Sequence, residues 1–95
     1  MMELAWTPEA IQDRNDIYDY IEPENLVAAL TLDELIPEKV QWLTRHPDGG
    51  RLGRVPETRE LIIHPSYMLV YELVGEQVRV LNVVHTARQW PPSRT

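Results

Sequence analysis

The spacing of apolar residues changes once along this chain of 95 residues, and that change sets the fold class. Up to about Thr44, apolar side chains recur every three or four residues, which is the period of an amphipathic helix. From Thr58 onward they recur every second residue, which is the period of a strand with one buried face. The chain therefore combines helices in its first half with a sheet in its second half, the pattern of an α+β domain.

Two helices are expected before the change of period. Thr7 is a good N-cap and Pro8 suits the first helical position, so the first helix is predicted over residues 8–21. A second helix follows the short break at residues 22–25 and extends to about Thr44. The short break favours an antiparallel helical hairpin.

Pro37 lies inside the second helical pattern. A proline in a helix interior removes a backbone hydrogen bond and destabilises a regular helix by roughly 3 kcal/mol. Two helical pieces that meet near Pro37 and one bent helix are equally compatible with the sequence.

The whole chain, residues 1–95, is expected to form one domain, because a chain this short has no room for a second. Short turns join the last three strands into an antiparallel meander, and the loop at residues 46–50 contains Gly49-Gly50. The tail carries Pro91-Pro92 and is expected to fray over residues 93–95. The helical hairpin would cover one face of the sheet and leave the other face for a partner. The expected strands are Met2–Trp6, Arg59–His64, Tyr67–Leu73 and Gln77–Val84.

The net charge of −6 is unevenly distributed. Residues 1–47 hold ten acids and three basic residues, a charge of 3 − 10 = −7, whereas residues 48–95 hold six arginines and five acids, a charge of +1. The first half repels polyanions, so an anion-facing surface can form only from the second half. A generic nucleic-acid binder has a basic domain, and we expect no direct sequence-specific DNA binding by this chain.

Several other classes of function are excluded by composition. The chain has no cysteine, no metal-ligand spacing among its three histidines, and no phosphate-binding glycine loop, so no cofactor or metal is expected. Its apolar runs are too short for a transmembrane helix or a signal peptide. A cytoplasmic location without membrane contact is the default expectation.

Three motifs follow one another in the second half: R-E-L at Arg59, Y-x-L-V-Y at Tyr67 and V-x-H-x-x-R-Q-W-P at Val83. In sequence and spacing they resemble ParE-type plasmid-stabilisation toxins of the RelE/ParE superfamily. The stretch at residues 16–21 and the loop at residues 50–54 resemble the family's first helix and its helix-to-sheet loop. Pro37 and Pro56-Glu57 depart from the family pattern, since a glycine often precedes the threonine at the position of Thr58.

The resemblance implies the toxin component of a bacterial type II toxin–antitoxin system, with the β-α-α-β-β-β order of the RelE/ParE-like fold. It also implies a cognate antitoxin as protein partner. ParE-type members are associated with inhibition of DNA gyrase, whereas RelE-type members are ribosome-dependent ribonucleases that cleave mRNA. A third alternative is an inactive relative that only binds an antitoxin.

The expected catalytic cations of a ribonuclease are largely missing. RNA cleavage through the 2′-hydroxyl needs a base, an acid and cations that stabilise the charge on phosphorus. RelE-type ribonucleases resemble one another in placing a basic residue after the tyrosine of the Y-x-L-V-Y strand and two on the preceding strand. Here those positions hold Met68 and, after Arg59, Leu61. We therefore favour a ParE-like toxin that binds DNA gyrase over an enzyme.

Five residues remain as candidates for a target-binding site. Four of them could also serve a ribonuclease, whose partners would be the ribosome and mRNA. For His85 the structural alternative is a strand-end hydrogen bond, and for Arg88 it is an ion pair with an acid of the first helix. Trp90 is more typical of an anchor that pins the tail onto the sheet. The candidates are Arg54, Arg59, His85 and Arg88, followed by Trp90.

Overall fold

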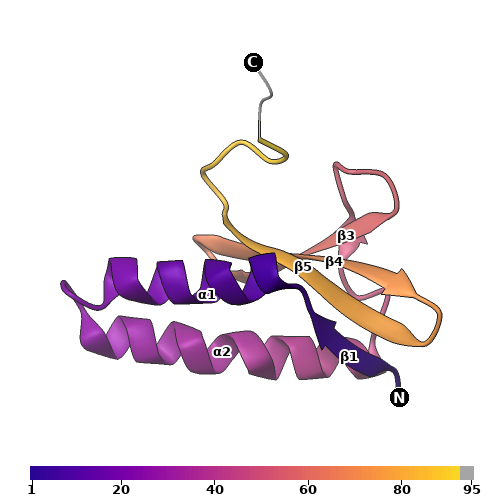
Figure 1. Ribbon diagram of the computed structural model, residues 1–95, viewed down its shortest axis with the longest axis horizontal. Helices are drawn as coiled ribbons and strands as arrows, with labels where there is room; N and C mark the ends of the chain where they lie inside the picture. The colour runs from indigo at the N-terminus through magenta and orange to yellow at the C-terminus, as the bar shows by residue number, and fades with distance from the viewer. Residues whose placement is uncertain (93–95) are drawn as a thin grey trace.

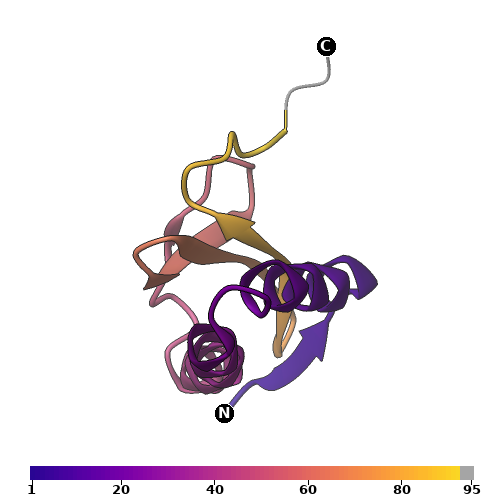
Figure 2. The same cartoon turned by 90° about the vertical axis from the view of Figure 1, so that its left-hand side faces the viewer.

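The computed structural model describes residues 1–92, so the expected frayed tail at 93–95 lies outside the described residues. The elements follow the predicted order with one addition, a two-residue strand before the meander. The helices lie antiparallel on one face of the sheet, as Figures 1 and 2 show. None of the helices in the described residues is long and apolar enough to cross a membrane. The elements are β1 (Glu3–Trp6), α1 (Pro8–Ile21), α2 (Leu26–Arg45), β2 (Arg51–Leu52), β3 (Thr58–His64), β4 (Tyr67–Val74) and β5 (Gln77–His85).

The five strands form one sheet in the order β1-β5-β4-β3-β2. The predicted antiparallel meander of β3, β4 and β5 is confirmed. The first strand returns to the far edge and pairs with β5 in parallel, with Leu4 opposite Val78. β2, which the sequence analysis placed in irregular loop structure, pairs antiparallel with β3 through Arg51 and Leu52. A strand of two residues is too short to show the alternation of apolar and polar side chains by which strands are predicted.

Each helix begins at a capping side chain, Thr7 for α1 as predicted and Asn25 for α2. The Thr7 hydroxyl accepts a hydrogen bond from the Ala10 N–H at 3.1 Å, and the Asn25 side chain does the same for Ala28 at 3.0 Å. Side-chain oxygens at this position satisfy backbone donors that have no partner within the helix. The two caps thus fix both ends of the short connection in the helical hairpin.

Pro37 does not divide the second helix, because α2 runs without a break from Leu26 to Arg45. Proline lacks the N–H that would bind the carbonyl four residues earlier, which is that of Asp33. Arg14 of α1 supplies a substitute: its Nη2 lies 3.1 Å from the Asp33 carbonyl and 3.0 Å from Asp33 Oδ1. The same guanidinium lies 5.1 Å from the ring centre of Trp6. The hydrogen bond from Arg14 to the Asp33 carbonyl explains how a single helix accommodates an interior proline.

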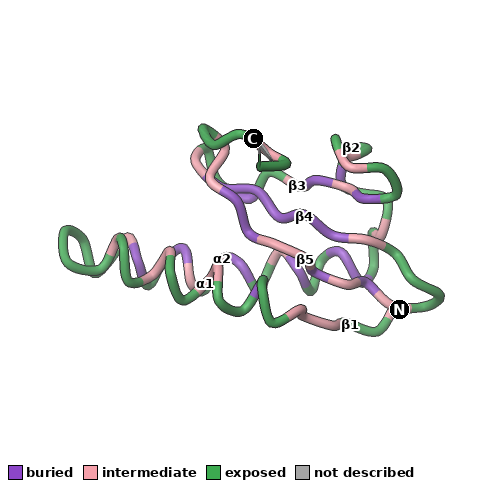
Figure 3. Tube along the Cα trace, turned by 45° about the horizontal axis from the view of Figure 1, so that its top comes forward, coloured by how far each residue is buried: buried purple, intermediate pink, exposed green. Residues whose placement is uncertain are grey.

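Apolar side chains fill both faces of the sheet. The larger core lies between helices and sheet and includes Ile36, Val40 and Leu43 of α2 against Leu69 and Tyr71 of β4. A smaller cluster lies on the opposite face of the sheet and consists of Met68, Val70 and Val84. Met68 and Val70 alternate along β4 with Leu69 and Tyr71 of the larger core. Leu81 and Trp90 pack against the smaller cluster. Figure 3 shows the buried stretches running along the central strands.

The loop at residues 46–50 is held against the sheet by one buried hydroxyl. Tyr71 Oη donates to the Pro47 carbonyl and accepts from the Gly50 N–H, each at 2.8 Å. A Cβ on Gly50 would lie 2.7 Å from the Tyr71 ring and hydroxyl, so this position requires glycine. Arg59 Nη1 donates to the Gly50 carbonyl at 2.8 Å and completes the attachment.

Candidate target-binding site

A pocket of about 590 Å³ lies between α1, the end of β5 and the tail that follows it. One wall is acidic and comes from α1, through Asp13 and Asp16. The other wall carries His85, Arg88 and Trp90. Three of the five candidate residues therefore meet in one concave site.

The acidic wall is fixed to the sheet by Asp13. β5 continues past the end of its partner β1, so its outer backbone edge needs other hydrogen-bond partners there. Asp13 Oδ2 accepts from the Val83 N–H at 2.9 Å and from Asn82 Nδ2 at 3.0 Å. At the start of the same edge, the Thr7 hydroxyl donates to the Leu81 carbonyl at 2.8 Å. Side chains of α1 and of its N-cap residue thus replace a neighbouring strand and hold the helix beside the end of β5.

His85 forms the centre of the basic wall. Its Nδ1 accepts a hydrogen bond from the Ala87 N–H at 3.0 Å, so the neutral ring carries its proton on Nε2. Its ring meets Tyr67 edge to face, with the ring centres 5.1 Å apart. This geometry includes the strand-end hydrogen bond considered as the structural alternative, and it also places His85 on the pocket wall.

Arg88 is exposed on the same wall. Its backbone N–H donates to the His85 carbonyl at 3.0 Å, which closes the turn after β5. None of the ion pairs among the described residues includes Arg88, so the alternative of a pair with an α1 acid is absent from residues 1–92. Burial raises the pKa of the Tyr67 hydroxyl, as does the neighbouring Tyr20, whereas the charge of Arg88 opposes this effect.

Trp90 joins the pocket to the second face of the sheet. Its ring packs against the cluster of Met68, Val70 and Val84, as expected of a residue that anchors the tail. Its indole Nε1 is buried and has no hydrogen-bond partner among the described residues. Leaving a buried donor without a partner costs about 1–3 kcal/mol, so the burial of Trp90 against the cluster is opposed by this one polar atom.

Arg54 and Arg59 do not line this pocket. Arg59 lies opposite Tyr71 in the sheet and binds the loop carbonyls of Gly50 and, at 3.5 Å, Asp48. Arg54 is exposed, and its backbone N–H donates to Glu60 Oε2 at 3.0 Å. The structure therefore separates Arg54 and Arg59 from His85, at the end of β5, and from Arg88, in the turn that follows it.

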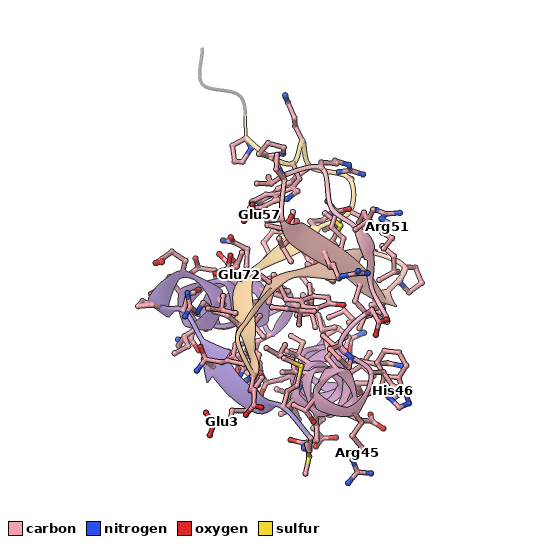
Figure 4. The ribbon with its side chains drawn as sticks, turned by 90° about the vertical axis from the view of Figure 1, so that its right-hand side faces the viewer. Glu3, Arg45, His46, Arg51, Glu57 and Glu72 are labelled. Carbon is pink, nitrogen blue, oxygen red and sulfur yellow. The ribbon has the colours of Figure 1, made fainter. Side chains whose placement is uncertain are left out.

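Glu60, a carboxylate buried on β3, is a structural residue that the sequence patterns do not predict. Its side chain is only 1% exposed and binds the Arg51 guanidinium through Oε1 at 3.0 and 3.1 Å. Burial by itself raises the pKa of Glu60, but the hydrogen bonds from Arg54 and Arg51 and their positive charges outweigh it, so the pKa lies below its ordinary value. Its bonds to Arg51 and to the Arg54 N–H fix the loop between β2 and β3. Arg51 of β2 and Glu57 of this loop are labelled in Figure 4.

Asp13, Asp16 and Tyr20 also line the pocket, although they are not among the candidates predicted from the sequence. Their spacing of three and four residues places them on one face of α1, and that spacing was the available signal. The sequence does not reveal their role in the pocket, because a helical pattern does not show which strand end the helix will face.

The pocket combines hydrogen-bond donors and acceptors on opposite walls. His85 Nε2, Arg88 and the Tyr67 hydroxyl can donate hydrogen bonds, and Asp16 on the opposite wall can accept them. No group of three or more potential metal ligands occurs within residues 1–92. A mixed donor and acceptor lining of this kind suits a protein segment with both kinds of polar group.

Solved structures define the class of this fold. The chain resembles a structure of the chromosomal ParDE toxin–antitoxin system of P. aeruginosa with a TM-score of 0.79 and 27% identity, covering 90% of this chain and 96% of the other. It resembles the E. coli RelBE toxin–antitoxin complex with a TM-score of 0.67 and 19% identity, covering 93% and 100%. The fold is that of the RelE/ParE superfamily of toxins.

Sequence comparison then identifies the family. A model of the ParE toxin of the type II toxin–antitoxin system parDE matches residues 4–90, and the chain belongs to this family. A protein named as a toxin, Y4kP of Sinorhizobium fredii, is 32% identical over 93% of this chain and 92% of its own length. Toxin RelE2 of Caulobacter vibrioides is 30% identical over 93% and 99%. The predicted superfamily and fold class are thus confirmed.

Proposed function

We propose that this toxin acts by binding a bacterial type II topoisomerase, DNA gyrase, and that a cognate antitoxin neutralises it. The single observation that carries the choice of a binding mechanism is the character of the sheet face opposite the helices. Met68 occupies the position where a RelE-like ribonuclease is expected to have a cation, and it is 2% exposed within the apolar cluster of Val70, Val84 and Trp90. An apolar surface cannot stabilise the charge that develops on phosphorus.

The pocket beside α1 is the proposed contact with the target. His85, Arg88 and Trp90 lie together there, and arginine and tryptophan are the residue types that most often dominate protein interfaces. Arg54 and Arg59 form a second, separate candidate contact. Because Arg59 is already bound to the loop at residues 48–50, Arg54 is the more available of the two.

Expression of the chain without antitoxin tests the target. The proposal expects growth arrest with induction of the DNA-damage response, while translation continues and mRNA stays intact. Purified gyrase should lose supercoiling activity in the presence of the toxin. Co-expression of the cognate antitoxin should restore growth.

A matched set of arginine variants tests the pocket. Arg88→Ala should weaken gyrase inhibition by roughly tenfold or more, the loss expected from a central interface arginine. Arg45→Ala removes an exposed arginine at the end of α2 and should leave inhibition unchanged. Equal inhibition by both variants would remove the pocket from the proposal, and Arg54→Ala would then report on the second contact.

A RelE-like mRNA interferase is the second candidate. It is favoured by the similarity to toxin RelE2 and by the placement of His85 and Arg88 on one wall. It predicts rapid loss of protein synthesis, with mRNA cleaved only when ribosomes are present, and loss of cleavage in a His85→Ala, Arg88→Ala double variant. Absence of any growth arrest would instead indicate a relative that only binds an antitoxin.

A further inference from the structure

The first two turns of α2 are apolar on all sides. Residues 26–32 read LVAALTL and contain no charge, and their one polar side chain, Thr31, bonds the Val27 carbonyl of the preceding turn at 2.7 Å. Ala29 and Leu32 face inward and are 2% and 5% exposed. Leu26, Val27 and Leu30 are 51%, 73% and 46% exposed. We call these three exposed residues the hairpin-end patch.

The position of the patch leaves it uncovered by the rest of the chain. The connected ends of the two helices extend beyond the ends of the strands, and this end of the hairpin is exposed in Figure 3. A helix that is apolar all round is normally buried, and exposed apolar groups gathered in one place usually mark an interaction site. The first two turns of α2 therefore have the composition of a helical segment with a partner on its outer side.

The charge around the patch selects the kind of partner. Residues 15–38 hold seven acids and no lysine or arginine. Two acids precede the patch in the connection between the helices, and two follow it in the next turn of α2. One of these four, Asp33, is paired with Arg14. A second copy of this chain would bring the same charges together, which opposes self-association, whereas a basic partner would be attracted. The seven acids are Asp16, Asp19, Glu22, Glu24, Asp33, Glu34 and Glu38.

The secondary structure of the partner follows from the backbone of α2. The N–H and C=O groups of a helix are bonded within it, so a partner strand would find no edge to pair with here. A partner helix satisfies its own backbone and can place apolar side chains between Leu26, Val27 and Leu30. We propose that the hairpin-end patch is the docking site of a basic amphipathic helix that carries a row of apolar side chains flanked by lysine or arginine. The inference rests on the proposed function in taking this helix to be part of the antitoxin.

The test uses the whole toxin and a synthetic probe of stated composition. The probe is an amphipathic peptide of about 18 residues, long enough to form a helix, with leucines on one face and lysines beside them. A second peptide has glutamate in place of every lysine. Fluorescence anisotropy should detect binding of the lysine peptide, weakened by added salt, and at least about tenfold weaker binding of the glutamate peptide.

Two double variants locate the binding. Val27→Ser with Leu30→Ser should weaken binding of the lysine peptide by at least about tenfold. Ile11→Ser with Leu52→Ser removes two other exposed apolar side chains and should leave the affinity unchanged. Circular dichroism shows whether both double variants stay folded. Val27→Lys keeps the helix but places a like charge against the lysine peptide, so it should also weaken binding of this peptide.

Three results would overturn the inference. They are equal binding of the two peptides, unchanged affinity in the Val27 and Leu30 variants, and a toxin dimer in sedimentation that these substitutions dissociate. None of them bears on the growth and gyrase assays, which need no peptide. Failure of this inference is therefore distinguishable from failure of the proposed function.

Discussion

Glu57 has a backbone conformation that few side chains adopt. Its φ is 67°, in the left-handed region, where a residue with a Cβ is disfavoured by about 1–2 kcal/mol. The family pattern often has a glycine directly before the threonine at the position of Thr58, where this chain has Glu57. The left-handed φ gives the reason, because glycine has no Cβ and adopts such a φ without strain. Gly75, in the turn between β4 and β5, has a φ of 59° and open space around its Cβ position.

Substitutions at these two residues should act in opposite directions. Glu57→Gly should stabilise the toxin by about 0.5 kcal/mol, because relief of strain exceeds the added entropy of the unfolded chain. Gly75→Ala should destabilise it by about 1 kcal/mol, since no neighbouring atom offsets the strain. Urea unfolding measures both free energies, and a loss of stability in Glu57→Gly would contradict the role assigned to its φ.

Glu60 makes stability depend on pH in the acid range. Its pKa in the folded state is below its ordinary value of 4.5, so its contribution to stability is fully present above that pH. The contribution is lost as pH falls through the folded pKa, because the unfolded chain binds the proton more readily. Glu60→Gln should therefore be less stable than the parent at pH 7.

The difference in stability between the parent and Glu60→Gln should become smaller below pH 4.5. Thermal unfolding across this range measures it, with Glu72→Gln as the control. Glu72 also pairs with an arginine, Arg79, at 3.2 Å, but its side chain is 27% exposed against 1% for Glu60. Parallel pH curves for the parent and Glu60→Gln would show that Glu60 does not control the acid transition.

At the scale of elements, α1 and α2 depend on each other through Arg14 and Pro37. Arg14→Ala should destabilise the toxin by about 1–3 kcal/mol, because it leaves the Asp33 carbonyl and carboxylate without their charged donor. In a Pro37→Ala background the residue at 37 has an N–H that can bind this carbonyl, so the same substitution should cost less. A double-mutant cycle should give a coupling of about 0.5–1 kcal/mol.

The cycle separates this explanation from a simple ion pair. Asp33→Ala removes the carboxylate but keeps the carbonyl, and it should not abolish the coupling between residues 14 and 37. Additive effects of Arg14→Ala and Pro37→Ala would mean that the helix tolerates proline for another reason. Urea unfolding of the four proteins of the cycle provides the measurement.

At the scale of the molecule, a chain of this size is only modestly stable by itself, and a partner that binds only the folded state stabilises it. With antitoxin present at 100 times its dissociation constant, the gain should be about 2.7 kcal/mol. For a domain of about 100 residues this raises Tm by roughly 10–20 °C. Thermal scans at increasing antitoxin concentration measure the effect.

The double variant at Val27 and Leu30 is the matched control for this measurement. It should raise the antitoxin concentration needed for a given shift of Tm, while its Tm without antitoxin stays close to that of the parent. A shift of Tm independent of antitoxin concentration would argue against binding to the folded state. An equal concentration dependence in the variant would place the antitoxin elsewhere on the toxin.

Local patterns determined most of the elements. Thr7 and Asn25 define helix starts within a few residues of themselves, and the alternation around Tyr67 and Val83 defines strands in the same way. Such patterns depend only on neighbours along the chain, so the sequence by itself specified the helical hairpin, the meander and, through the spacing of its motifs, the toxin family.

Tertiary structure decided what lies between elements. The parallel pairing of β1 with β5, the short β2 strand, and the Arg14 contact that lets α2 continue through Pro37 all join residues far apart in the chain. The same holds for the site: Asp13 attaches α1 to β5 and creates a pocket around His85 and Arg88, while Arg59 turns to the loop at residues 48–50. Side-chain periodicity assigns a residue to a face of its own element, but only the packing of elements determines which faces meet.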